Sequence, residues 1–138
     1  MRASRRAHGR TTRVEYALPH EATSAGRARK LTTAFLTRPH RHSAALDMER
    51  VDEATLVVSE LVTNATRHGG SGCRLRLAIS DHRVTVEVHD DNPARPRMGS
   101  PEAGAESGRG LAIVRHLAES FEVVGARHGK TVRAVLAG

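Results

Sequence analysis

Hydrophobic and polar positions follow two different periods along this chain. From Asp47 to His68 the apolar positions recur at three- and four-residue steps, which is typical of one buried face of a helix. These positions are Val51, Thr55, Val58, Leu61, Val62 and Ala65. Asp47 is the predicted N-cap of this helix. A second helix is predicted over residues 21–37, and a shorter third helix over residues 110–118.

Alternation of apolar and polar residues predicts strands over residues 14–18, 74–79, 83–89, 121–124 and 131–136. Residues 91–109 are rich in proline and glycine and poor in apolar residues, so a long loop is predicted there. The resulting order is β-α-α-β-β-α-β-β. This order favours an α+β fold, a two-layer sandwich whose mostly antiparallel mixed sheet is covered by helices on one face.

The net charge of +7 on 138 residues is concentrated at the N-terminus. Residues 1–13 carry five arginines and no acid, so 17 basic and 15 acidic residues remain elsewhere. We therefore expect a basic flexible tail over residues 1–12 and one folded domain over residues 13–138. The tail could bind nucleic acid or an acidic partner, but no aromatic residues are interleaved to stack on bases, which argues against direct nucleic-acid binding.

Other classes of protein are disfavoured by simple counts. The apolar runs are too short for a membrane span, and no apolar block follows the basic N-terminus. A single cysteine, Cys73, cannot form an internal disulfide, so a soluble cytoplasmic protein is expected. Nine histidines lack the spacing of a metal site, and the chain has neither a nucleophile elbow nor a P-loop.

The end of the long helix carries the first candidate chemistry. Glu60 and Asn64 are four residues apart, so their side chains share one helix face, one turn from each other. A carboxylate there can accept a proton from an attacking hydroxyl, and a carboxamide oxygen can bind magnesium. By itself this spacing also occurs on ordinary solvated helix faces.

Four motifs, in order, resemble those of the Bergerat ATP-binding fold, which gyrases, histidine kinases and anti-sigma-factor serine kinases share. Residues 60–69 resemble the N-box, residues 86–93 the second motif and residues 106–111 the third, and residues 129–132 match the last. The resemblance covers about residues 14–137. The short single-domain form is most similar to the small actinobacterial anti-sigma-factor kinases.

The resemblance implies roles for individual residues. Asp90 would accept a hydrogen bond from the exocyclic amine of adenine, which guanine lacks at that position, and Thr131 would help to hold the adenine. Gly108 and Gly110 would let the backbone approach phosphate at the start of a helix, and Arg109 would add charge. The alternatives are a turn-forming aspartate, a glycine-rich helix start and an ordinary β-branched strand residue.

The resemblance implies an ATP- and magnesium-binding regulatory serine/threonine kinase of the anti-sigma-factor type. It would phosphorylate a small antagonist protein and could sequester a sigma factor, with Glu60 as the base and Asn64 as the magnesium ligand. Asn92 and Pro93 stand where many relatives have glycines, which makes the turn after Asp90 stiffer. The alternative is a non-catalytic ATP-binding module that acts by docking, and a homodimer remains open.

Overall fold

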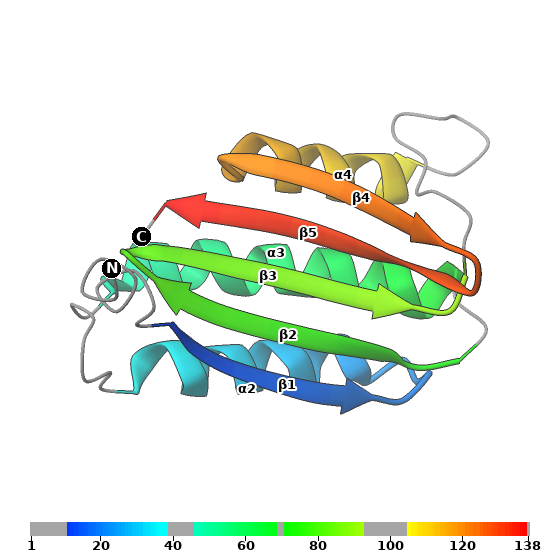
Figure 1. The fold of residues 1–138 in the computed structure, drawn as a ribbon, viewed down its shortest axis with the longest axis horizontal. Coiled ribbons are helices and arrows are strands. Elements are labelled where there is room, and N and C mark those ends of the chain that lie inside the picture. The colour runs from blue at the N-terminus through cyan, green and yellow to red at the C-terminus, as the bar shows by residue number, and fades with distance from the viewer. Residues whose placement is uncertain (1–10, 39–45, 69–70, 93–104, 138) are drawn as a thin grey trace, which may run out of the picture.

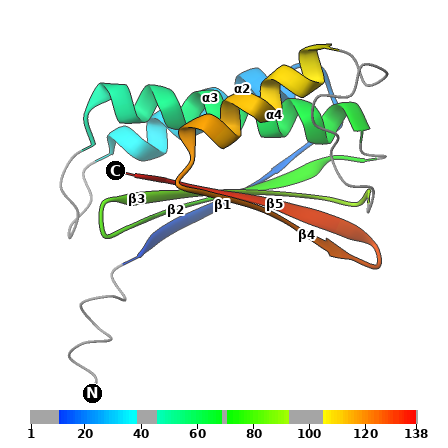
Figure 2. The same cartoon turned by 90° about the horizontal axis from the view of Figure 1, so that it is seen from above.

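The computed structural model describes residues 11–38, 46–68, 71–92 and 105–137 of the chain. Within these residues one layer is a five-stranded sheet and the other consists of three helices, which lie on the same side of the sheet (Figures 1 and 2). The predicted α+β two-layer sandwich with helices on one face is confirmed. None of the described helices is both long enough and apolar enough to cross a lipid bilayer.

The sheet pairs strands that are distant in the sequence. Its spatial order is β1 (Thr12–Leu18), β2 (Cys73–Ser80), β3 (Arg83–Asp90), β5 (Gly129–Ala137) and β4 (Ser120–Ala126). The prediction allowed for a mixed sheet, but every described pair is antiparallel. Strands β2 and β3 join through Asp81 and His82, whose φ angles of 50° and 62° match the twist of a two-residue hairpin.

The three helices are α2 (Ser24–Thr37), α3 (Met48–His68) and α4 (Ala105–Leu117). Asp47 caps α3 as predicted, because its Oδ1 accepts a hydrogen bond of 2.9 Å from the Arg50 backbone N–H. One predicted inward position on α3 is wrong: Thr55 is only half-buried, and its hydroxyl donates to the Asp52 carbonyl. The fully buried Ala54 takes its place in the core.

The core lies between α3 and the inner face of the sheet. Inward-facing positions alternate along the strands and consist of aliphatic residues: Leu75, Leu77, Ile79, Val84, Val86, Val88, Val132, Ala134 and Leu136. They meet the buried face of α3, which includes Val58 and Leu61. This continuous aliphatic layer holds the site-bearing ends of the strands and helices in fixed positions.

Two predicted boundaries differ from the structure. Helix α4 begins at Ala105, five residues before the predicted start, so the loop after Asp90 is shorter than expected. Strand β1 begins at Thr12, the last residue assigned to the tail. Residues 1–10, and most of the predicted loop over residues 91–109, lie outside the described part of the chain.

Four segments that carry the predicted site meet at one end of the molecule. The C-terminal ends of α3 and β3 and the beginnings of α4 and β5 all lie at the right-hand end of Figure 1. Antiparallel pairing of β3 with β5 brings Asp90 opposite Lys130 there. Motifs that are spread over about 70 positions of the sequence are thereby gathered into one region.

Candidate functional site

A buried ion pair connects the end of β3 to the beginning of β5. Lys130 Nζ lies 3.0 Å from Asp90 Oδ1, and the two side chains are only 3% and 2% exposed. Lys130 Nζ also donates to the Asn92 carbonyl oxygen at 2.9 Å, and the Asn92 N–H donates to Asp90 Oδ1 at 2.8 Å. These bonds compensate for the desolvation of both charges and brace the turn after β3.

The backbone around this pair is closely packed. Gly129 precedes Lys130, and a methyl group at Gly129 would overlap the backbone carbonyl oxygen of Asp90. Burial, and secondarily the negative charge of Asp90, raises the pKa of the Cys73 thiol to about 11. The burial of Cys73, Asp90 and Lys130, together with the close backbone approach at Gly129, indicates that little water surrounds Asp90 on this face.

Lys130 and Gly129 are the site residues that the sequence reasoning missed. A signal for Lys130 was present, because it shares strand parity with the apolar Val132, Ala134 and Leu136. An inward-facing lysine in such a strand needs a buried acceptor. The paired position on β3 supplies it in Asp90.

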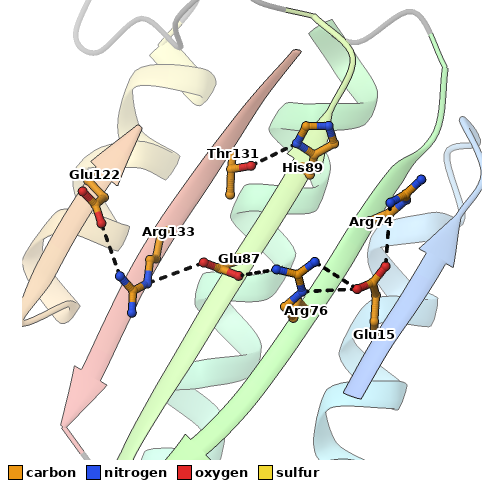
Figure 3. Close-up of polar contacts among 8 residues, drawn as sticks. All are labelled: Glu15, Arg74, Arg76, Glu87, His89, Glu122, Thr131 and Arg133. Atoms are coloured by element: carbon orange, nitrogen blue, oxygen red, sulfur yellow. Dashed lines mark hydrogen bonds and ion pairs between the residues drawn. The ribbon is translucent and has the colours of Figure 1, made fainter. Parts of the chain in front are cut away.

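Thr131 does not lie with Asp90. Strand alternation places its side chain on the outer face of the sheet, where its hydroxyl lies 2.9 Å from His89 Nδ1 (Figure 3). The expectation that Thr131 shares an adenine with Asp90 therefore does not fit the structure, since the sheet separates the two side chains. The inward position opposite Asp90 belongs to Lys130 instead.

The outer face around Thr131 is a network of exposed charges. Glu15, Arg76, Glu87, Arg133 and Glu122 occupy directly paired positions and form a row of alternating charge across the five described strands (Figure 3). Beside the row is an open hollow of about 240 Å³, lined by Arg74, Arg76, Glu87, His89 and Thr131. No predicted site residue other than Thr131 lies on this face.

Glu60 and Asn64 lie one turn apart in α3, and both are half-buried. Glu60 packs against α4 at Gly110, where an added methyl group would overlap the Glu60 Oε1 atom. The absence of a side chain at Gly110 thus makes room for the carboxylate. The structure brings the first and third motifs into direct contact through this pair of residues.

The position of the glycine motif is a correction to the sequence analysis. Gly108, Arg109 and Gly110 were expected where a loop enters a helix, but they lie inside α4, which begins at Ala105. Gly110 is buried against Glu60, so packing at this position offsets the low helix propensity of glycine. The Arg109 side chain, predicted to contact phosphate, lies outside what the structure describes.

The described side chains do not build a metal cage by themselves. Among them, no group of three or more His, Cys, Asp or Glu residues could hold a metal ion. Magnesium in nucleotide enzymes commonly has one or two protein ligands, with phosphate and water completing its shell. A half-buried amide such as Asn64, one helical turn from the Glu60 carboxylate on α3, fits that kind of site.

Comparison with protein families and curated sequences identifies the source of these motifs. Residues 18–136 match the model of the histidine kinase-like ATPase domain. A stretch of 53 residues is 38% identical to the signal transduction histidine-protein kinase AfsQ2 of Streptomyces coelicolor. This stretch is 38% of the present chain and 9% of that protein.

Solved structures share the fold at low sequence identity. The structure of the RsbU and RsbW domains of Rv1364c from Mycobacterium tuberculosis superposes with a TM-score of 0.68 at 18% identity, over 91% of this chain and 32% of that one. The histidine kinase domain of a blue-light activated histidine kinase from Erythrobacter litoralis gives a TM-score of 0.55 at 22% identity, over 86% and 61% of the two chains. The chain thus spans less than two thirds of each of these proteins.

Proposed function

This chain belongs to the family of histidine kinase-like ATPase domains, and on that premise we propose that it is an ATP- and magnesium-binding serine/threonine kinase of the anti-sigma-factor type. One observation carries the proposal. A buried carboxylate, Asp90, lies at the end of the molecule where the motif-bearing ends of α3 and α4 meet. The residue that we propose to contact adenine and the residue that we propose as the base therefore lie at the same end of the molecule.

Asp90 selects the base in this proposal. Both of its hydrogen bonds to described residues end on Oδ1, which leaves Oδ2 to accept from the exocyclic amine of adenine. The carboxylate cannot donate to the carbonyl oxygen that guanine has at the same position. ATP is therefore preferred over GTP.

Glu60 and Asn64 act on the phosphates. Glu60, seated against Gly110, accepts the proton of the attacking serine or threonine hydroxyl. The Asn64 carboxamide oxygen binds magnesium, which neutralises phosphate charge when it is present. Helix α4 begins at the same end (Figure 1), so the backbone N–H groups of its first turn can face an anion. Gly108 and Arg109 remain proposed phosphate contacts within that first part of α4.

The phosphate acceptor is proposed to be a serine or threonine of a small antagonist protein. The resemblance of the motifs supports this type of kinase, and the structure of the RsbU and RsbW domains of Rv1364c shares the fold. Direct sequestration of a sigma factor and a cytoplasmic location belong to the same proposal.

Phosphotransfer to candidate antagonists tests the proposal. With labelled ATP and magnesium, Glu60→Gln should lower the transfer rate by about 10²–10⁴-fold while ATP binding persists, because the substitution removes the base and little volume. Asn64→Ala should weaken magnesium-dependent ATP binding as well as transfer. Glu49→Gln, in the exposed first turn of the same helix, is the matched control and should transfer at the parent rate.

The outcomes separate the kinase from its alternative. Transfer at the parent rate by Glu60→Gln would show that Glu60 is not the base. Tight ATP binding by the parent, with no transfer to any antagonist, would favour the non-catalytic module that acts by docking. Equal affinity for GTP and ATP would contradict the role of Asp90.

A further inference from the structure

Lys130 is a buried charged residue that the proposed phosphotransfer does not use. Lysine is rarely buried in proteins, yet this one is 2% exposed and makes its described contacts only to Asp90 and Asn92. It occupies the inward position of β5 that pairs directly with Asp90. Any base that contacts Asp90 from the helix side of the sheet therefore meets Lys130 as well.

The pair retains unused hydrogen-bonding capacity. An ammonium group has three N–H donors, and two are directed to Asp90 Oδ1 and the Asn92 carbonyl. Among the described residues nothing accepts from the third. Asp90 likewise has no described donor on Oδ2. One donor and one acceptor are thus available side by side.

We propose that Lys130 is a specificity-determining residue of the nucleotide site, which donates to adenine N1 while Asp90 accepts from the neighbouring exocyclic amine. This inference rests on the proposed function, because it assumes that the site binds ATP. Adenine presents a donor next to an acceptor on this edge, and the pair presents the complementary acceptor and donor. Guanine presents the two groups in the opposite order, so it mismatches at both contacts.

The choice of residue agrees with this role. Of the 22 lysine and arginine residues in the chain, only Lys30 and Lys130 are lysines. A compact ammonium fits between a carboxylate oxygen and a carbonyl oxygen in a closed space, whereas a planar guanidinium needs a wider fork. Lys130 also fixes the turn after β3 through its hydrogen bond to the Asn92 carbonyl oxygen.

The test measures dissociation constants with magnesium for ATP and two analogues. The analogue 1-deaza-ATP lacks N1, and purine riboside triphosphate lacks the exocyclic amine. In the parent protein each analogue should bind about 10- to 100-fold more weakly than ATP, because each loses one charge-assisted hydrogen bond. The quantity of interest is the ratio of the analogue constant to the ATP constant.

Lys130→Met should weaken ATP binding by about the same 10- to 100-fold and bring the 1-deaza-ATP ratio close to one. The purine riboside ratio should stay above one, because Asp90 is still present. Lys30→Met is the matched control, since Lys30 is exposed on α2, and both of its ratios should equal those of the parent.

A merely structural lysine predicts a different result. In that case Lys130→Met would weaken all three nucleotides equally and leave the 1-deaza-ATP ratio at the parent value, which would overturn the inference. Tighter ATP binding by Lys130→Met would also overturn it, because the lysine would then occupy the place of the base. If the parent protein binds ATP tightly but binds 1-deaza-ATP equally well, the role of Lys130 is contradicted while the proposed function still stands.

Folding of the variant is controlled separately. If Lys130→Met does not fold, the double variant Asp90→Asn with Lys130→Met leaves no unpaired buried charge, and it should show a 1-deaza-ATP ratio close to one. A ratio retained in the double variant would contradict the role of Lys130. A parent that binds no nucleotide would overturn the proposed function together with this inference.

Discussion

The two faces of the sheet carry ion pairs of nearly the same length in opposite surroundings. On the inner face Lys130 and Asp90 are 3.0 Å apart and 3% and 2% exposed. On the outer face Arg76 and Glu15 are 3.1 Å apart and 52% and 43% exposed (Figure 3). Distance alone therefore does not tell what a pair contributes, because the surrounding dielectric and the alternative of hydration differ.

Because their exposure differs, the charges on the two faces contribute to the protein in different ways. The outer row makes one face of the sheet hydrophilic, and each of its exposed ion pairs adds little to the free energy of unfolding. The row consists of Glu15, Arg76, Glu87, Arg133 and Glu122. The inner pair is shielded from water, so the charge of each partner is compensated mainly by the other partner. A buried pair of this kind is weak evidence for stability, but its hydrogen bonds fix the orientation of the Asp90 carboxylate.

The largest expected effect is that of breaking the inner pair. Lys130→Met leaves Asp90 buried without its counter-charge and should lower the free energy of unfolding by about 3–5 kcal/mol. Urea unfolding without nucleotide, followed by circular dichroism, measures it. Adding Asp90→Asn should recover part of the loss. A loss below about 1 kcal/mol would place the inner pair in the class of the outer row.

The next effect concerns Cys73 on the inner face. Its folded-state pKa of about 11 lies above the ordinary 9.0, so the folded protein holds the thiol proton more tightly than the unfolded chain. The free energy of unfolding should then fall by up to about 3 kcal/mol as the pH rises from about 9 to about 11. In parallel urea titrations, Cys73→Ala should not show this fall in the free energy of unfolding between pH 9 and pH 11. Identical pH slopes for parent and variant would contradict it.

A glycine comparison tests how closely the backbone packs beside Asp90. Gly129→Ala places a methyl group against the Asp90 carbonyl and should cost about 1–3 kcal/mol. Gly125→Ala is the matched control on β4, where an added methyl group meets no atom within 4 Å, and its cost should stay within about 0.5 kcal/mol. Thermal unfolding of the two variants provides the measurement. Equal losses would show that the approach of β5 to Asp90 is looser than described.

The smallest effect is expected on the outer face. Arg76→Met removes contacts of 3.1 Å to Glu15 and 3.2 Å to Glu87, yet it should cost only about 0.2–1 kcal/mol. The difference from the parent should shrink further in 1 M salt, where the screening length is about 3 Å. Unfolding titrations at low and high salt check both statements. A salt-independent loss above about 2 kcal/mol would mean that the outer row acts like a buried network.

Much of this architecture could be predicted from the sequence, because it depends on local patterns. Helical spacing on α3 and alternation in the strands reflect burial of one face, and Asp47 is a local capping signal that the structure bears out. Four separated motifs were sufficient to indicate the family that residues 18–136 match. The alternation of β5 also predicts that Lys130 points inward, on the same side as Val132, whereas Thr131 points outward.

Contacts between distant segments were decided by the tertiary structure alone. Glycine has a low intrinsic helix propensity, yet Gly110 lies inside α4. The packing of α4 against Glu60 explains this, because the contact leaves no room for a side chain at position 110. Asp90 and Lys130 are 40 positions apart, and only the register of β3 against β5 makes them partners. Strand register is set by how the whole inner face of the sheet packs against the helices. No local sequence pattern could therefore predict that Lys130 is the cation paired with Asp90.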